Sequence, residues 1–209
     1  MDQQLELTRR RLLELGLALP VPFLISACGG AGSADETERS TQPTTTLAPT
    51  PACDDGDEPT PEQTEGPFFT SDSPERRSLL EPGVEGTTLV LTGSVLATDC
   101  TPIGGALLDF WHADGNGEYD NEGYRLRGHQ FADGQGRFRL ETIVPGVYSG
   151  RTRHIHVKVQ ARGGPVLTTQ LYFPGEAGNE RDGLFDRALL MAVRSAAGGR
   201  AARFDFVLS

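Results

Sequence analysis

Hydrophobic and polar residues alternate in short runs through the second half of the chain. In Thr88–Leu96 and His154–Ala161 every second residue is apolar, which is the period of a strand with one buried face. Further runs of this kind lie at Ala106–His112, Gly136–Ile143, Val166–Phe173 and Ala202–Leu208. Turn sequences such as Asp133-Gly-Gln-Gly separate the runs. This rhythm predicts a mainly β fold, an antiparallel β-sandwich.

One apolar segment near the C-terminus lacks this alternation. It spans about residues 183–197 and contains Leu184 and the run Ala188-Leu-Leu-Met-Ala-Val. We expect one short helix there, as the exception in an otherwise β domain.

The N-terminus carries an export pattern. Thr8-Arg9-Arg10-Arg11 precedes an apolar stretch from Leu15 to Ala27, which is short and interrupted by prolines, so a spanning helix is not expected. We interpret residues 1–27 as a twin-arginine signal peptide. Because Ile25-Ser-Ala-Cys28-Gly29 matches a lipoprotein cleavage site, we expect a lipidated Cys28 that anchors the exported protein to the outer side of the cell membrane.

A polar, acidic stretch follows the signal. Residues 28–58 are rich in Thr, Pro, Ser and acidic side chains, which predicts a disordered tether. Residues 29–65 hold nine acidic residues and one arginine, and therefore −8 of the net charge of −10. Residues 66–209 therefore carry only about −2, and this nearly neutral part of the predicted catalytic domain (residues 59–209) has a single lysine, which argues against a nucleic-acid partner and limits membrane contact to the lipid.

Two histidines in one predicted strand suggest a metal site. His154 and His156 are two residues apart, so their side chains point to the same face of the strand, roughly 7 Å apart along it. A carboxylate from Asp109, Asp114 or Glu118 could complete a two-His site for ferrous iron or zinc. The phenols of Tyr119 and Tyr148 are the other candidates, whereas His112 and His129 are expected to be structural.

Several motifs resemble those of the intradiol ring-cleavage dioxygenases. They occur in the order of that family and extend from about Thr64 to Phe206. The matching stretches are Thr64-Glu-Gly-Pro-Phe-Phe69, Cys100–Tyr119, Leu126–Phe138, Thr142–His156 and Gln170–Pro174.

The resemblance implies a site for non-haem ferric iron. Its four protein ligands would be Tyr119, Tyr148, His154 and His156. Two phenolates and one hydroxide balance the three positive charges of Fe(III), so the buried site carries no net charge. A catechol dianion that replaces the hydroxide and one phenolate keeps this balance.

The resemblance also implies the reaction and its residues. A catechol-type diol would be cleaved by O₂ between its two hydroxyl-bearing carbons to a cis,cis-muconate-type product. As the substrate binds, Tyr148 would leave the metal and accept a proton from a hydroxyl group of the substrate. Arg151 would stabilise carbanion character on the ring and Gln170 would orient the substrate or an intermediate. Arg153 is a competitor for the arginine role, but a strand would point it away from both histidines.

The chain departs from the family pattern at two places. Phe68-Phe69 stands where many members have Tyr-Tyr, and the N-terminal helical dimerisation segment of cytosolic catechol dioxygenases is not found. The oligomeric state of the cytosolic enzymes therefore does not transfer to this chain, and a homo-oligomer is one alternative. If Cys28 is lipidated, Cys53 and Cys100 remain, and in an exported protein they are expected to form one disulfide.

Two other classes of protein remain as alternatives. One is a non-catalytic β-sandwich that binds a surface ligand, although such a module has no need of two Tyr and two His at these positions. The other is a metal-dependent hydrolase that uses the histidine pair and a carboxylate.

Overall fold

The computed structural model of the protein describes residues 58–209. The predicted signal peptide, Cys28, Cys53 and the predicted tether up to residue 57 lie outside the described residues. In the part that is described, no helix is long and apolar enough to cross a membrane.

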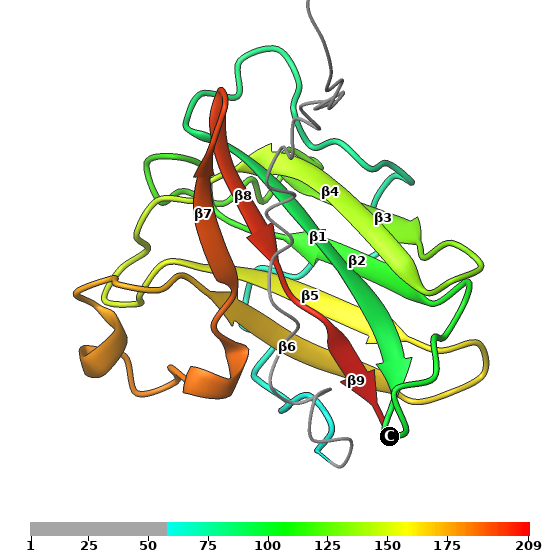
Figure 1. Ribbon diagram of the computed structural model, residues 1–209. Helices are drawn as coiled ribbons and strands as arrows, with labels where there is room; N and C mark the ends of the chain where they lie inside the picture. The colour runs from blue at the N-terminus through cyan, green and yellow to red at the C-terminus, as the bar shows by residue number, and fades with distance from the viewer. Residues whose placement is uncertain (1–57) are drawn as a thin grey trace, which may run out of the picture. The chain divides into compact units, whose positions relative to one another are not determined.

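The described residues fold into two packed sheets (Figure 1). One has the strand order β4-β1-β8-β7, with β9 paired to β1. Its strands are β1 (Thr88–Ala97), β4 (Arg137–Ile143), β7 (Ala192–Ala196), β8 (Gly199–Arg203) and β9 (Phe206–Leu208). The other has the order β3-β2-β5-β6. Its strands are β2 (Leu107–Trp111), β3 (Arg127–Phe131), β5 (His154–Gln160) and β6 (Val166–Tyr172).

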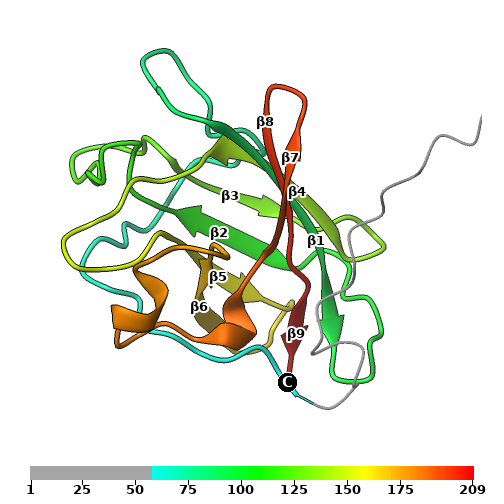
Figure 2. The same cartoon turned by 60° about the vertical axis from the view of Figure 1, so that its left-hand side comes forward.

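The core lies between the two sheets, which face each other in Figure 2. Alternate residues of β1, such as Leu89 and Leu91, are fully buried there. Phe110 of β2 and Val157 of β5 are also fully buried and belong to the same cluster. The predicted mainly β sandwich is therefore confirmed, and its cause is the alternation of apolar residues along each strand.

The sandwich is not purely antiparallel. β1 pairs antiparallel with β4 but parallel with both β8 and β9. The run expected as one strand at 202–208 is interrupted at Asp205, whose carboxylate accepts a hydrogen bond from the backbone N–H of Ser94 at 2.8 Å. At the break between β8 and β9, the Asp205 side chain thus supplies the hydrogen-bond acceptor for this N–H group of β1.

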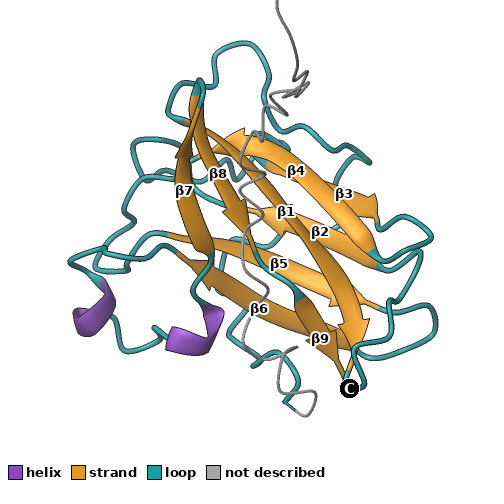
Figure 3. Ribbon diagram, in the orientation of Figure 1, coloured by secondary structure: helices purple, strands orange, loops and turns teal. Residues whose placement is uncertain are grey.

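The helix predicted at about residues 183–197 is wrong. Two short 3₁₀ turns, η1 (Asn179–Arg181) and η2 (Arg187–Leu189), are the helical segments among residues 58–209 (Figure 3). The Asp186 carboxylate caps η2 through the backbone N–H of Ala188, and Leu190 is already extended. Residues 192–196 form β7, since Gly198, with φ of 79°, lets the chain turn back into β8. Leu190 forms a bridge with Tyr172, so tertiary pairing also overrides the helical preference of the Ala-Leu-Leu-Met run.

Candidate metal centre

β5 presents its two histidines on the face of the sheet opposite the core. Val157 and its alternate neighbours point between the sheets, whereas His154 and His156 point outward. The histidines are still buried, with 5% and 3% of their surface exposed. Loops between the strands must therefore cover this face, and these loops supply the remaining site residues.

Strand register places further side chains in one row with His156. Trp111 of β2 lies opposite His156 on one side, and Gln170 of β6 lies opposite it on the other. Arg127 of β3 extends the row beyond Trp111. Side chains at paired positions share a face of the sheet, so these four residues line one side of the site.

Three possible metal-donor atoms lie close together at the Nε2 atoms of the two histidines. The Nε2 atoms of His154 and His156 are 3.1 Å apart, and the phenol oxygen of Tyr119 is 3.4 Å from His154 Nε2. Ligand atoms that are each bound about 2 Å from one ion lie about 3 Å apart. The spacing of the three atoms therefore fits a single metal ion.

Both imidazoles are kept neutral by their surroundings. His154 Nδ1 lies 2.6 Å from the backbone oxygen of Thr152 and so carries the proton, which leaves the lone pair on Nε2. Burial lowers the pKa of His154 to about 4, although the Thr152 carbonyl opposes the shift. Burial, followed by the neighbouring His154, holds the pKa of His156 well below its usual value. Neutral rings with free lone pairs are what a metal requires.

Two loops that carry the phenols are joined through their backbones. The Asp114 carboxylate accepts hydrogen bonds from the backbone N–H groups of Asn116 and Glu118, which shapes the turn before Tyr119. The backbone oxygen of Asp114 accepts one from Gly146 at 2.6 Å, two residues before Tyr148. The rings of Tyr119 and Tyr148 meet edge to face at 5.6 Å.

The Phe68 ring fills the space beside both phenols. It stacks on Tyr119 at a centroid distance of 4.4 Å and contacts Tyr148 edge-on at 5.1 Å. The buried Arg127 guanidinium donates to the Phe68 backbone oxygen at 2.5 Å and to the Asp120 backbone oxygen at 2.6 Å. Arg127 thus links the Phe68 segment to the loop of Tyr119.

Burial also acts on the Tyr119 phenol. It raises the pKa of Tyr119 to about 12, against the attraction of Arg151 and Arg127. Without a bound cation the phenol therefore stays protonated at neutral pH, and a metal ion would have to displace this proton to bind the oxygen.

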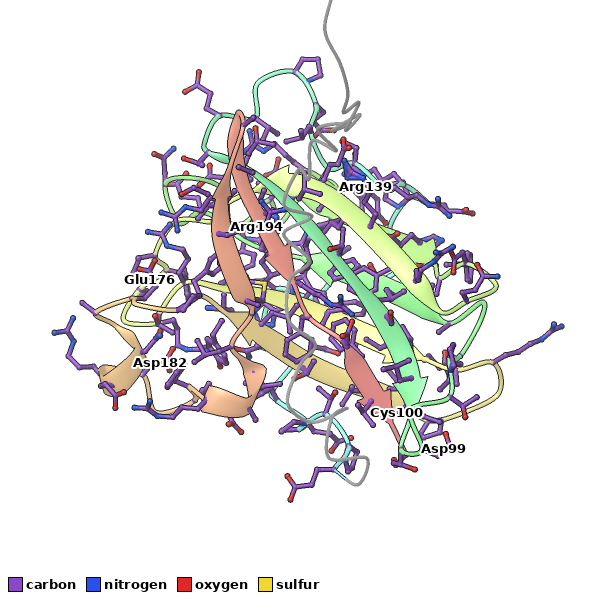
Figure 4. The ribbon with its side chains drawn as sticks, in the orientation of Figure 1. Asp99, Cys100, Arg139, Glu176, Asp182 and Arg194 are labelled. Carbon is purple, nitrogen blue, oxygen red and sulfur yellow. The ribbon has the colours of Figure 1, made fainter. Side chains whose placement is uncertain are left out.

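Arg151 is held beside the donors by a polar network. Its Nε donates to the Asp182 carboxylate at 2.8 and 3.0 Å, and one Nη donates to Gln170 Oε1 at 2.7 Å. The Gln170 amide nitrogen in turn donates to the backbone oxygen of Thr64 at 2.8 Å, and the Tyr172 hydroxyl donates to Oε1 at 3.0 Å. Figure 4 places Asp182 in the segment between β6 and β7.

The competing residues have other partners. Arg153 pairs with Glu176 at 3.2 Å. His112 is buried between the backbone oxygen of Ala113 and the Thr142 hydroxyl, and His129 lies 2.7 Å from the Ser73 backbone oxygen, in keeping with structural roles.

A carboxylate ligand is not favoured by the geometry. Asp109 accepts a hydrogen bond from Ser73, Asp114 is used in its own turn and Glu118 is exposed. Among residues 58–209 no group of three or more His, Cys, Asp and Glu side chains is arranged to hold a metal. The third donor beside the imidazoles is instead the Tyr119 phenol, so the described residues fit a phenol-imidazole centre.

A cavity lies away from the proposed centre. It has a volume of about 540 Å³ and is lined by residues such as Ala161, Val166 and Leu208. Ala161 directly follows β5, whereas the two histidines lie at the start of this strand. None of the predicted site residues lines it, so donor geometry rather than cavity size locates the centre.

The sequence alone did not reveal two contributors to this site. Asp182 is 31 positions from Arg151, and no local pattern links them. Trp111 is the single tryptophan and precedes His112, but only the register of β2 and β5 brings it against His156.

Comparison with known proteins gives consistent matches. Residues 64–209 match the model of a family described as dioxygenase. The dioxygenase domain of a dioxygenase and carbohydrate-binding protein fusion from Streptomyces sp. SirexAA-E is 59% identical, with a TM-score of 0.71, over 73% of this chain and 99% of that one.

Two curated relatives are more distant. A chlorocatechol 1,2-dioxygenase of Pseudomonas sp. strain P51 is 28% identical over 69% of this chain and 68% of its own length. Catechol 1,2-dioxygenase 2 of Acinetobacter lwoffii is 31% identical over 66% of this chain and 62% of its own. The chain spans about half to two thirds of the length of the curated relatives it matches.

Proposed function

Since the chain belongs to the family of intradiol ring-cleavage dioxygenases, we propose that it uses ferric iron to open the ring of a catechol-type diol. Tyr119, Tyr148, His154 and His156 would hold the iron. The observation that carries the proposal is the position of His154 Nε2, which lies 3.1 Å from His156 Nε2 and 3.4 Å from the Tyr119 oxygen. Both atoms of O₂ would enter the product, which would be of the cis,cis-muconate type.

The donor set favours ferric iron over other metals. Phenolates are hard anions, which stabilise the +3 state, and imidazole is a common iron ligand. When bound, ferric iron would take up both oxygens of the diol and make the ring reactive toward O₂.

Tyr148 is the ligand that we expect to move. Both phenols are half-buried and both contact Phe68, but the backbone beside Tyr119 is also held at Asp120 by the Arg127 guanidinium. On substrate binding the Tyr148 oxygen would accept a proton from a diol hydroxyl, so that charge in the site stays balanced.

Arg151 would act on the substrate ring as a fixed positive charge. Its Nε is occupied by Asp182 and one Nη by Gln170, which sets the plane of the guanidinium. A preorganised cation stabilises negative charge as it develops on the ring. Gln170 has both ends of its amide engaged within the protein and would act by orienting Arg151.

The substrate is proposed to be a diol without a carboxylate. Two further arginines near the site are paired within the protein, Arg127 with backbone oxygens and Arg153 with Glu176. Catechol or a chlorinated catechol, the substrates that the names of the relatives state, would need no additional cation. Protocatechuate is expected to react more slowly than catechol.

Metal analysis and a visible spectrum of the purified protein test the function. A tyrosinate-iron(III) protein should be red to burgundy, and should consume O₂ when catechol is added. Tyr148→Phe should weaken the visible band while the fold is retained. Colourless protein that shows no O₂ uptake after reconstitution with iron would disprove the proposal.

Export and lipid anchoring are part of the same proposal. They rest on Arg9-Arg10-Arg11 and on the lipobox at Cys28, outside the described residues. Incorporation of labelled palmitate into the wild type, with none into Cys28→Ser, is the expected outcome. Equal labelling of both proteins would refute lipidation at Cys28.

A further inference from the structure

The two histidines of the centre are oriented by different contacts. Metal-bound histidines usually donate their second ring N–H to an oxygen, which fixes the orientation of the ring. His154 follows this rule through the Thr152 backbone oxygen. His156 does not, because its buried Nδ1 has no hydrogen-bond partner among the described residues.

A parallel ring contact takes the place of that hydrogen bond. The Trp111 indole lies against the His156 imidazole with a centroid distance of 4.8 Å and only 9° between the planes. Its own Nε1 is buried and has no partner in the described part of the chain, so Trp111 meets the site through its ring face rather than through its N–H.

Trp111 is itself held firmly. It is 1% exposed, lies opposite His156 in the β2–β5 ladder, and is packed on the edge by Phe69 at 4.9 Å. The backbone of Gly66 covers another side of His156, since a Cβ atom built on this glycine would lie 3.4 Å from Cε1. Little room remains for the imidazole to rotate away from the plane of the indole.

We infer that Trp111 is the positioning residue of His156, and that its ring face secures this ligand in the metal-bound protein. The inference rests on the proposed function, in which His156 binds iron. A metal-bound imidazole gains positive character, and the face of tryptophan is the strongest aromatic partner for a cation. The stack therefore stabilises the iron-bound protein more than the iron-free one.

A spectroscopic consequence follows from composition. Trp111 is the only tryptophan of the chain, so all indole fluorescence comes from the ring that touches His156. Iron at His156 would lie within a few ångströms of this ring, and we expect Fe(III) addition to the iron-free protein to quench the emission. Removal of the iron by a chelator should restore it.

Variants of Trp111 test the role. Trp111→Leu should bind Fe(III) about 10- to 100-fold more weakly than the wild type in competition with nitrilotriacetate, the usual cost of losing a partner of a metal ligand. Trp111→Phe keeps a ring face and should be intermediate. Phe110→Leu is the matched control, because Phe110 is the adjacent buried aromatic on the opposite face of β2 and should lower stability without changing iron affinity.

The outcomes separate this inference from the proposed function. If the wild type binds no iron, the proposed function fails. If the wild type and a folded Trp111→Leu bind iron within about 2-fold of each other, only the role of Trp111 is overturned. Should Trp111→Leu not fold, Trp111→Phe and the wild-type fluorescence decide, and emission that iron leaves unchanged would also overturn the inference.

Discussion

Asp182 binds Arg151 through the guanidinium Nε, with both carboxylate oxygens within 3.0 Å. The carboxylate is nearly fully buried, with 2% of its side chain exposed, and also accepts the backbone N–H groups of Thr152 and Leu184. Burial opposes its ionisation, but these two N–H groups and Arg151 outweigh burial, and the pKa of Asp182 is lowered. The carboxylate is thus a fixed anion that aims the arginine toward Gln170.

Asp182→Asn should therefore impair catalysis more than metal binding. The amide keeps the size of the side chain but loses the charge, so the guanidinium is less firmly held. We expect kcat to fall about 10- to 100-fold, because small errors in the position of a reacting group are costly. KM for catechol and iron content should change little.

A second ion pair provides the control for this variant. Glu176→Gln breaks the Arg153–Glu176 pair, which lies in the neighbouring part of the same segment (Figure 4). It should leave kcat close to that of the wild type. Equal losses in both variants, or a loss of iron that parallels the loss of activity in Asp182→Asn, would contradict a positioning role for Asp182.

Tyr119→Phe should weaken iron binding without disturbing the fold. The change removes only the oxygen that lies 3.4 Å from His154 Nε2, and the ring can still stack on Phe68. We expect at least about 10-fold weaker retention of iron, since losing a ligand costs no less than losing the partner of a ligand. Absorbance of the iron-loaded protein during chelator titration measures it.

Tyr124→Phe is the matched control for the phenol. Its hydroxyl donates to the backbone oxygen of Ser71 and to none of the proposed ligands. The visible spectrum of this variant should equal that of the wild type. A Tyr119→Phe protein with unchanged colour and iron affinity would remove Tyr119 from the ligand set.

Local patterns were enough for β1, β2, β4, β5 and β6 and for the histidine pair, whereas β3 and β7 were not predicted as strands. The two-residue spacing of His154 and His156 fixes their common face once β5 is a strand, whatever the rest of the chain does. Contacts made across the sheet were not predictable in this way. The stack of Trp111 on His156 depends on the register of β2 against β5, which no run of residues specifies alone.

The error at residues 183–197 has a related cause. The apolar run there has good helix formers, and nothing within it signals that Val193 will pair with Ala202. The Gly198-Gly199 dipeptide was the one local indication of a hairpin, whose turn is formed by Ala197 and Gly198. Pairing with β8 supplies what the isolated segment lacks, so a non-local interaction decides its structure.

Gly93→Ala should destabilise the sandwich. A Cβ atom at this position of β1 would lie 1.7 Å from the backbone oxygen of Phe204 and 2.9 Å from the Phe138 ring. The overlap should lower the free energy of unfolding by about 3 kcal/mol, the upper part of the usual range for overpacking. Urea unfolding of the iron-free protein would measure the loss. Gly134→Ala has open space around it and should be nearly neutral, so equal stability of the two variants would contradict the packing argument.

The predicted disulfide between Cys53 and Cys100 can be tested by thiol titration. Cys100 lies in the turn after β1 (Figure 4), and Cys53 is outside the described residues. A bridge would close a loop of about 47 residues and stabilise the domain by about 4 kcal/mol in the chain-entropy model. We expect the purified, unreduced protein to show neither of these thiols until reductant is added. Two titratable thiols at positions 53 and 100 in native protein would exclude the bridge.

Acid should destabilise the iron-free protein below about pH 6.5, the usual pKa of an unfolded histidine. Burial lowers the pKa of His112 and of His154 to about 4, and that of His156 well below its usual value. Between pH 6.5 and 4 these residues are therefore protonated in the unfolded chain but largely neutral in the folded one. Each proton taken up on unfolding lowers the free energy of unfolding by about 1.4 kcal/mol per pH unit as the pH falls.

Urea unfolding at several pH values from 7.5 to 5 measures this slope, and His112→Gln separates one contributor. The variant should take up one proton fewer on unfolding, so its free energy of unfolding should depend less steeply on pH. It will also be less stable at pH 7.5, because His112 bonds the Ala113 backbone oxygen and the Thr142 hydroxyl. Asp182 cannot produce the same slope, since its lowered pKa affects stability only below about pH 4. A free energy of unfolding that is constant from pH 7.5 to 5 would show that the three imidazoles are not buried as neutral groups, and would remove the basis for their low pKa values.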